Sequence, residues 1–271
     1  MKVRYLTLIL LCLLLLHPLS AEGESGDKRE NLSAISVPIL LYHRFGPVVT
    51  DSMTVTTKVF EWQMKYLKDN GYSVIPLRRL VDYYSRKGPP PPPRSVVIAA
   101  DDGHKSVYTD MFPFVKKYRF PVTLFIYPSA ISNASYAMTW DQLREIIKSG
   151  FMDVQSHAYW HPNFKKEKKR LKPDRYEKFV EIQLKKSAQK LEKELGVHVD
   201  MLAWPFGIYD DQLVLKAREA GYIAAFTIER RNATGADNIM KLPRYIMVDA
   251  DRGGTFERLL SGNPVPRKIV Y

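Results

Sequence analysis

The stretch Val96-Val97-Ile98-Ala99-Ala100-Asp101-Asp102-Gly103 runs from five apolar residues straight into two adjacent carboxylates and a glycine. Because the apolar run does not alternate with polar residues, it predicts a strand that is buried on both faces. The α/β folds place their chemistry at the carboxyl ends of such strands, so this edge is a candidate site. Successive side chains of a strand point to opposite faces, and Asp101 and Asp102 should therefore have different partners. An ordinary surface turn is the alternative, since Asp-Gly is a common turn signal.

The N-terminus shows the residue order of a secretory signal. Lys2 and Arg4 precede an apolar run over residues 8–16, and small residues end at Ala21. The run is too short to span a bilayer, although an uncleaved anchor is the alternative. The rest of the 271-residue chain, which is 45% hydrophobic overall, is long enough for one sizeable core. We therefore expect a signal peptide over 1–21, a flexible leader over 22–36 and one domain over 37–271, exported to the periplasm or the cell exterior.

Cysteine content and charge narrow the class of protein. The single cysteine, Cys12, lies in the predicted signal, so the mature chain has no thiol for catalysis and no disulfide. The formal charge is +12, and removal of Lys2 and Arg4 with the signal leaves +10. A basic exported protein is expected to be attracted to anionic envelope polymers or to a membrane surface. No zinc finger or aromatic RNA-binding motif is present, which argues against a nucleic-acid partner.

Strand-like and helix-like segments alternate along the chain. The expected strands cover residues 37–43, 72–76, 96–101, 121–127, 152–156, 201–204, 222–228 and 242–248. The expected helices cover residues 60–70, 77–84, 108–118, 140–148, 173–195 and 211–220, and the basic run 165–172 is expected to be a solvated loop. This alternation predicts a parallel α/β barrel or a doubly wound sheet. Four polar or aromatic side chains then stand at strand ends on one face: His43, Asp101, His157 and Trp204.

A second group of polar residues follows another predicted strand. In Ser156-His157-Ala158-Tyr159-Trp160-His161-Pro162 two histidines are four residues apart. Imidazole suits zinc, iron, cobalt or nickel, and an aspartate adds a harder third ligand. Two histidines and one aspartate leave coordination positions open for water and substrate, as a catalytic site requires. The alternative is that either histidine is a structural residue.

Three motifs in this order carry a family resemblance. Asp101-Asp102-Gly103, then Ser156-His157 with His161-Pro162, then Trp204-Pro205-Phe206-Gly207 together resemble the polysaccharide deacetylase family, carbohydrate esterase family four. The likeness covers about residues 37–250, and its details look most like the exported poly-N-acetylglucosamine deacetylases. The resemblance implies a deformed (β/α) barrel of about seven parallel strands, with the active site at the C-terminal strand ends.

The resemblance also implies an activity for the domain over 37–271. It is that of a metal-dependent deacetylase acting on an acetylated polysaccharide, an N-acetylhexosamine polymer such as poly-N-acetylglucosamine, peptidoglycan or chitin. An acetyl-xylan-type O-deacetylase shares the site and differs in the shape of the groove. A carbohydrate-binding pseudoenzyme without turnover is an alternative of another class.

Matched by position, the resemblance assigns the reacting groups. It makes Asp101 the general base. It makes Asp102, His157 and His161 the ligands of one divalent metal ion, with zinc first and cobalt, nickel or iron as alternatives. The chemistry is coherent, because a metal with open positions activates water and polarises the acetyl carbonyl.

The substrate contacts come from the same comparison. A backbone N–H near Tyr159 is expected to stabilise the oxyanion. Trp204, Pro205 and Phe206 are expected to surround the acetyl methyl and the sugar ring. Ordinary barrel packing is the alternative for these three side chains, and it is as plausible as ligand contact for Phe206.

The sequence departs from the family pattern in several places. Ala99-Ala100 stands where Thr-Phe is usual, and Ala203 stands where an arginine is common. The late Leu-x-His motif, which carries a catalytic acid in many members, is missing, because the last histidine of the chain is His198. The strand-one histidine, His43, is therefore the expected acid, with a hydrogen-bonded structural role as the alternative.

The sequence also suggests surroundings for three further side chains. Arg244 on the last predicted strand could pair with Asp101 and lower its pKa, or could equally face solvent. His104 and His198 are expected to be surface residues.

Overall fold

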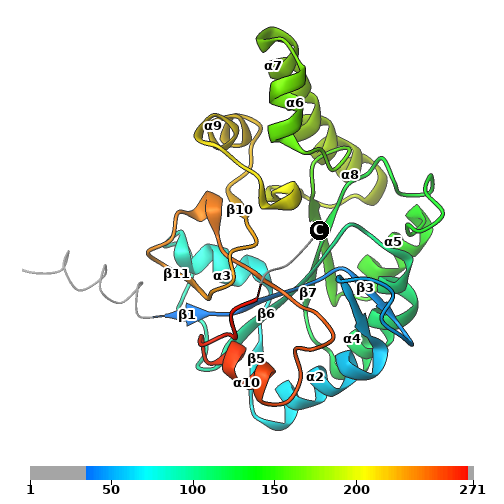
Figure 1. Ribbon diagram of the computed structural model, residues 1–271, viewed down its shortest axis with the longest axis vertical. Helices are drawn as coiled ribbons and strands as arrows, with labels where there is room; N and C mark the ends of the chain where they lie inside the picture. The colour runs from blue at the N-terminus through cyan, green and yellow to red at the C-terminus, as the bar shows by residue number, and fades with distance from the viewer. Residues whose placement is uncertain (1–34, 268–271) are drawn as a thin grey trace, which may run out of the picture.

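A curled parallel sheet carries the candidate site (Figure 1). The structure, a computed structural model, describes residues 35–267, so the predicted signal over 1–21 and nearly all of the predicted leader lie outside the described residues. The strands are β1 Ser36–Val37, β2 Ile39–Tyr42, β3 Arg44–Gly46, β4 Thr54–Thr56, β5 Ser73–Val74, β6 Ser95–Asp101, β7 Val122–Ile126, β8 Met152–Ser156, β9 Met201–Ala203, β10 Ala224–Phe226, β11 Ala233–Thr234 and β12 Tyr245–Ile246. The α-helices are α2 Thr57–Asp69, α3 Leu77–Tyr84, α4 Phe112–Tyr118, α5 Trp140–Lys148, α6 Phe164–Arg170, α7 Pro173–Glu181, α8 Ser187–Leu195, α9 Asp211–Glu219 and α10 Gly254–Leu260. Two π-helical turns, η1 Val107–Met111 and η2 Ile182–Lys186, and two 3₁₀ turns, η3 Pro205–Gly207 and η4 Ile239–Lys241, complete the elements.

The main sheet has the strand order β10-β9-β8-β7-β6-β2-β12, and β5 pairs with β6 off this path. Every pairing in it is parallel. A further parallel bridge joins Phe226 to Leu242, just before β12, so the segment that leads into the last strand lies beside β10. The seven strands therefore curl into a deformed barrel, as predicted, rather than a flat doubly wound sheet.

The two faces of the sheet pack against different partners. Along β2, Leu40 and Tyr42 join the core beneath the outer helices, whereas Ile39 and Leu41 join a second core that includes residues of α3. Along β6, Val97 and Ala99 belong to this second core, on the inner face of the barrel. Alternation then places Asp101 on the inner face as well.

Most predicted elements are present, with bounds that differ for physical reasons. The first predicted strand is divided between β1 and β2, because Pro38 has no N–H to donate to a ladder. Ser36, assigned to the leader, already pairs with Thr234. The predicted helix 173–195 is continuous but contains the π turn η2, and the predicted helix 108–118 begins as the π turn η1.

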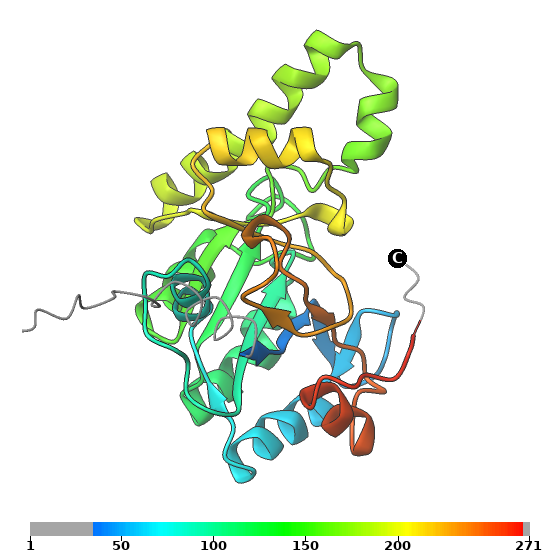
Figure 2. The same ribbon diagram turned by 90° about the vertical axis from the view of Figure 1, so that its left-hand side faces the viewer.

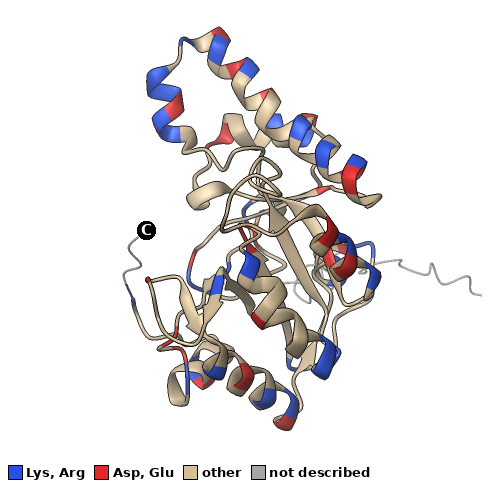
Figure 3. Cartoon of the chain, turned by 90° about the vertical axis from the view of Figure 1, so that its right-hand side faces the viewer, with Lys and Arg blue, Asp and Glu red and all other residues tan. Residues whose placement is uncertain are grey.

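The expectation of a loop over 165–172 was wrong. Residues 164–170 form α6, whose first turn is capped by the Asn163 side chain accepting from the Lys166 N–H. Phe164 is buried and anchors the helix, while the lysines and arginines around it stay exposed. Helices α6 and α7 project from one end of the molecule (Figures 1 and 2) and carry many basic side chains (Figure 3). Over residues 35–267, no helix is both long enough and apolar enough to cross a membrane.

Candidate active site

Strand β6 delivers the two carboxylates to different surroundings. Asp101 is its last residue and is buried, whereas Asp102 adopts a left-handed backbone with φ of 74°. Gly103 follows with φ of 76°, and a Cβ there would lie 3.0 Å from the side chains of Ile126 and Ile131. Only glycine fits this sharp turn without strain. The Asp-Asp-Gly sequence thus ends the strand and sends Asp101 and Asp102 in different directions.

Asp101 is held by an arginine from the far end of the chain. Arg244 is fully buried and donates from Nη1 and Nη2 to the two oxygens of Asp101, each at 2.8 Å. Its Nε donates to the Thr227 carbonyl at 3.0 Å, which fixes the plane of the guanidinium. Burial alone would raise the pKa of Asp101, but Arg244, helped by His157, holds it below the ordinary value. Asp101 is therefore ionised at neutral pH.

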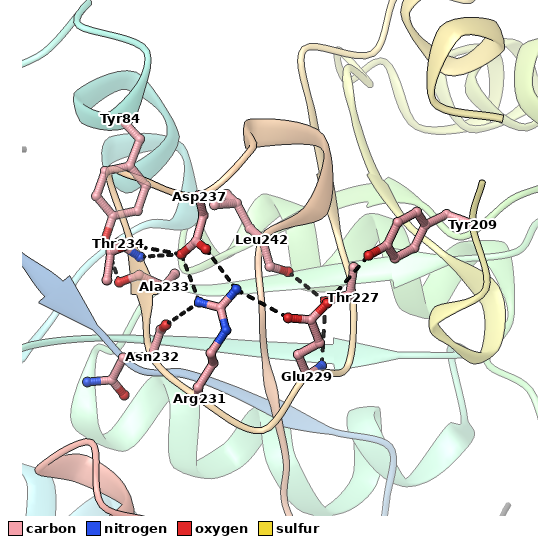
Figure 4. Close-up of polar contacts among 10 residues, drawn as sticks. All are labelled: Tyr84, Tyr209, Thr227, Glu229, Arg231, Asn232, Ala233, Thr234, Asp237 and Leu242. Atoms are coloured by element: carbon pink, nitrogen blue, oxygen red, sulfur yellow. Dashed lines mark hydrogen bonds and ion pairs between the residues drawn. The ribbon is translucent and has the colours of Figure 1, made fainter. Parts of the chain in front are cut away.

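Hydrogen bonds and ion pairs fix the segment that contains Thr227, whose carbonyl accepts from Arg244 (Figure 4). Thr227 begins the segment between β10 and β11. Downstream in this segment Arg231 pairs with Asp237 at 2.7 Å and with Glu229 at 3.2 Å. The Tyr84 hydroxyl donates to the Ala233 carbonyl at 2.8 Å and ties the segment to α3. The Thr227 carbonyl that orients Arg244 thus belongs to a segment that side-chain contacts hold in place.

Asp102, His157 and His161 converge on one point. One ligand atom of each lies within 4.8 Å of the others. The Asp102 Oδ1 is 3.6 Å from His157 Nε2 and 3.7 Å from His161 Nε2, too far for hydrogen bonds. Within residues 35–267 this Oδ1 is buried and has no hydrogen-bond partner. Three donor atoms arranged around a shared space, one of them an orphaned buried oxygen, fit a divalent cation.

The protonation of the histidines agrees with this fit. His157 Nδ1 lies 2.8 Å from the Ala203 carbonyl, which can only accept, so Nδ1 carries the proton and Nε2 keeps its lone pair. Burial lowers the pKa of His157 to about 4, and it lowers the pKa of His161 to about 4 as well. Both imidazoles are neutral near pH 7, as a metal ligand must be.

The backbone between the two histidines is strained and tied to a helix. Ala158 and His161 both have φ of 59°, an uncommon conformation for residues with a Cβ. The Trp160 N–H donates to Gln183 Oε1 at 2.9 Å, and the Ser187 hydroxyl donates to the Ala158 carbonyl at 3.0 Å. Gln183 and Ser187 are fully buried, one in the π turn η2 and the other at the start of α8. We call this pair the helix clamp.

His43 lies between β2 and β3 at the same end of the barrel. Its side chain is 8% exposed, and its Nδ1 has no hydrogen-bond partner in the described part of the chain. It lies close enough to Asp101 and His161 to influence the pKa of both electrostatically. The alternative role for His43, a structural histidine held by hydrogen bonds, is therefore not supported at Nδ1.

These groups line a cavity of about 600 Å³ at the C-terminal ends of the strands. Its lining comprises His43, Arg44, Asp51, Ser52, Met53, Asp101, Asp102, His104, Tyr127, Tyr136, His157, His161, Trp204, Phe206 and Ile228. The volume suits a small organic ligand rather than a single ion, since such pockets measure about 300–1,000 Å³. The ionised Asp101, two neutral imidazoles and a candidate cation site in this cavity are the parts needed for metal-assisted hydrolysis.

Comparison with known proteins identifies the family. Residues 88–225, just over half of the chain, match the polysaccharide deacetylase family. The chain belongs to the polysaccharide deacetylase family. The matched region includes Asp101, Asp102 and both histidines of the convergent group.

Relatives and solved structures agree with this deacetylase fold. A protein of Staphylococcus aureus strain N315, named poly-beta-1,6-N-acetyl-D-glucosamine N-deacetylase, is 25% identical, and the match covers 96% of this chain and 97% of that protein. The Streptococcus pyogenes deacetylase PplD in complex with acetate superposes with a TM-score of 0.75 at 22% identity, over 85% of this chain and 99% of that chain. IcaB from Ammonifex degensii gives a TM-score of 0.71 at 22% identity, over 83% and 96% of the two chains.

The predicted substrate contacts of the deacetylase are partly on the cavity wall. Trp204 is buried, lines the cavity and donates from Nε1 to the Met240 carbonyl at 3.0 Å. Phe206 lines it too, 36% exposed, with its ring 4.4 Å from that of His161. Pro205 and the side chain of Tyr159 are not part of the lining. Gly207 completes the motif because a Cβ there would lie 2.5 Å from Ile228, the third apolar residue of this wall.

Sequence reasoning missed the other wall of the cavity. His104, expected at the surface, is half-buried and lines the cavity, with its Nδ1 2.8 Å from the Ser106 hydroxyl. No site role was expected for Arg44, Asp51, Tyr127 and Tyr136, which line the cavity as well. Arg44 directly follows His43, which was a usable signal, but nothing in the periodicity marks the others. His198 is exposed, as expected.

Proposed function

We propose that this deacetylase is an exported, metal-dependent enzyme that hydrolyses the N-acetyl groups of a poly-N-acetylglucosamine-type polymer. The observation that carries the proposal is the convergence of Asp102, His157 and His161 beside the separately held Asp101. The name of the full-length staphylococcal relative supports the choice of polymer. The secretory pattern over residues 1–21 supports export.

Asp102, His157 and His161 would hold one divalent metal ion, zinc first among the candidates. When bound, such an ion supplies Lewis acidity toward the acetyl carbonyl and makes water acidic enough to attack near neutral pH. The protein's part is to keep these donors converged and the two imidazoles neutral. Burial lowers the pKa of both histidines to about 4, so protons compete poorly for them at neutral pH.

Asp101 is the proposed general base. It is not among the three converged donors, and Arg244 keeps it ionised and aligned through two hydrogen bonds at 2.8 Å. A carboxylate has about four lone-pair positions, so it can still accept the proton of the attacking water. His43, close to Asp101 and unbonded at Nδ1 within residues 35–267, is the proposed acid that protonates the leaving nitrogen.

The remaining parts surround the acetyl group. Trp204, Phe206 and Ile228 offer an apolar wall for its methyl. The Trp160 N–H is already bonded to Gln183, whereas the Tyr159 N–H has no partner among the residues that the structure describes. The Tyr159 N–H is therefore the proposed backbone donor to the oxyanion.

Acetate release tests the proposal. The mature protein, loaded with zinc, cobalt or nickel, should release acetate from β-1,6-linked N-acetylglucosamine oligomers and lose this activity on chelation. Chitin oligomers, peptidoglycan and O-acetylated xylan are the comparison substrates. Faster release from acetylated xylan than from any N-acetylated polymer would overturn the N-deacetylase assignment, and no release from any of them would overturn the enzyme assignment.

A further inference from the structure

The cavity has a second wall whose residues the proposed reaction does not use. We call Arg44, Asp51, His104 and Tyr136 the polar wall; all four line the same cavity as the candidate metal ligands. Hydrolysis of one acetyl group needs a nucleophile, a base, an acid and an oxyanion donor, and these are supplied elsewhere. The polar wall is therefore available to bind another part of the substrate.

Tyr136 is an exposed aromatic ring that is nonetheless fixed in place. It is 42% exposed, and its ring stacks on that of His104 at 6.2 Å and 11°. Its hydroxyl lies 2.7 Å from the Tyr127 hydroxyl, and its carbonyl accepts from the Lys105 N–H at 2.8 Å. An exposed ring held by stacking and through its hydroxyl, on a hydrogen-bonded backbone, loses little conformational entropy on binding, so it is a prepared platform for an apolar ligand face.

The position of Tyr136 relative to the metal ligands decides what could stack on it. The Tyr127 ring stands 5.3 Å from His161 and 6.5 Å from His157. Tyr136 contacts Tyr127 through their hydroxyls, but within residues 35–267 its ring packs on His104 and on neither of the two histidines of the convergent group. We take a sugar that packs on Tyr136 to be a different unit from the one whose acetyl group lies at those donors. It would be a neighbouring unit of the same chain.

Arg44 and Asp51 supply matching polar contacts. They form an ion pair with side chains 39% and 35% exposed. Asp51 Oδ1 is fixed by the Met53 N–H and the Thr54 hydroxyl, both at 2.9 Å. A neutral pair with free donor and acceptor positions suits uncharged hydroxyl groups better than an anion. An aromatic platform beside such a pair matches a pyranose, which has an apolar C–H face and an equator of hydroxyls.

We propose that the polar wall is a subsite for the sugar unit adjacent to the one being deacetylated, so that the enzyme selects chains over single N-acetylglucosamine. This inference rests on the proposed function, because it takes the ligand to be the same polymer. The cavity volume of about 600 Å³ is consistent with more than an acetyl group in this space.

The test compares kcat/KM on a β-1,6-linked N-acetylglucosamine tetramer, on the monosaccharide and on a small aryl acetate. Tyr136→Ala should lower kcat/KM for the tetramer about tenfold and leave the monosaccharide and the aryl acetate within about twofold. Tyr136→Phe keeps the platform and should retain most of the tetramer preference. Trp62→Ala, which removes an aromatic side chain of similar exposure outside the cavity, is the matched control and should change none of the three. Equal losses on all three substrates in Tyr136→Ala would overturn the subsite.

Binding separates this inference from the proposed function. In an Asp101→Asn background, calorimetry should give tighter binding of the tetramer than of the monosaccharide, and adding Tyr136→Ala should weaken tetramer binding about tenfold. Tetramer affinity that is unchanged by Tyr136→Ala would overturn the subsite whether or not acetate is released. Tyr136-dependent tetramer binding, together with no acetate release by the metal-loaded protein that keeps Asp101, would support the subsite and overturn the proposed deacetylase activity.

Discussion

At the scale of the residue, the charge state of Asp101 depends on one buried guanidinium. Arg244 satisfies both carboxylate oxygens, and its own Nε is satisfied by Thr227. Without Arg244, burial would dominate and raise the pKa of Asp101. The proposed general base would then be protonated over more of the working pH range.

The substitution Arg244→Met tests this dependence. We expect the acid limb of the pH profile of kcat/KM to move to higher pH, so that activity falls more at pH 5 than at pH 8. The control is Arg230→Met, which also breaks a pair with a fully buried aspartate, Asp251 at 3.1 Å, away from the cavity. Arg244→Met should lose roughly 3–5 kcal/mol of stability, and Arg230→Met should lose less, because Arg267 still pairs with Asp251 at 3.0 Å. If the acid limb moves equally in both, the shift reflects general destabilisation rather than Asp101.

His43 is tested by substrates that differ in leaving group. An amide nitrogen must be protonated to leave, whereas an aryl acetate leaves as the phenolate and needs little help. The change His43→Ala should therefore reduce kcat/KM on N-acetylglucosamine oligomers at least about a hundredfold more than on an aryl acetate, with metal content unchanged. Equal losses on the two substrates would assign His43 a structural role.

The convergence of the candidate site residues could be predicted because their positions follow from chain order. A buried parallel strand must place its following residues at the carboxyl edge, so Asp101, Asp102 and His157 meet whatever the details of the helices. Tyr136 could not be predicted in this way. It lies between β7 and α5, in a segment whose shape depends on Ser132 in a left-handed conformation and on contacts with His104, neither of which leaves a periodic pattern.

At the scale of the element, the helix clamp links the long helix to the histidine loop. The π turn η2 adds one residue to a helical turn, and Gln183 and Ser187 on the buried side bond the loop at two points. Left-handed Ala158 and His161 persist only where the surroundings hold them. The clamp therefore stabilises the conformation in which the two imidazoles converge.

Removing the clamp should weaken metal binding before it weakens the fold. Gln183→Leu and Ser187→Ala should each lower metal affinity about 10–100-fold, measured by competition with a chelator. Lys185→Ala is the control and should bind metal as wild type does, because this side chain is exposed on the same turn and, among residues 35–267, pairs only with Glu181. A matching drop in the melting temperature of the metal-free variants, with unchanged metal affinity in the folded protein, would contradict the clamp.

The elements themselves were predictable to different degrees. The bounds of α3 and α5 follow directly from their apolar spacing and, for α5, from the Thr139 capping box. The π turns could not be predicted, because a single inserted residue barely changes a 3.6-residue pattern. Helix α6 was missed because its run of lysines is typical of a polar loop. The signals that indicate a helix there are Phe164 and the Asn163 cap.

At the scale of the whole molecule, the two buried imidazoles make stability depend on pH. Their pKa is about 4 in the folded protein, against about 6.5 when exposed. Between pH 6.5 and 4 the unfolded chain takes up protons that the folded chain cannot, so the folded state loses stability as the pH falls. The Asp101 pKa is lowered from 3.8 and contributes only below this window.

For the metal-free protein we therefore expect the free energy of unfolding to fall by at most about 1.4 kcal/mol per pH unit for each histidine across this window. The His161→Gln variant, which keeps a neutral side chain of similar polarity, should show a shallower decline. Denaturant unfolding at a series of pH values measures both. Identical slopes in wild type and variant would show that His161 is not buried in its neutral form.

Two adjacent carboxylates are assigned different roles, Asp101 as the general base and Asp102 as a metal ligand, and one paired measurement tests this assignment. Asp101→Asn and Asp102→Asn are isosteric changes one residue apart, and each is assayed for metal content and for acetate release from N-acetylglucosamine oligomers. We predict that Asp101→Asn keeps its metal and loses at least about a hundredfold in turnover, while Asp102→Asn loses its metal and its activity together. Loss of metal from Asp101→Asn, or full metal content in Asp102→Asn, would contradict the account.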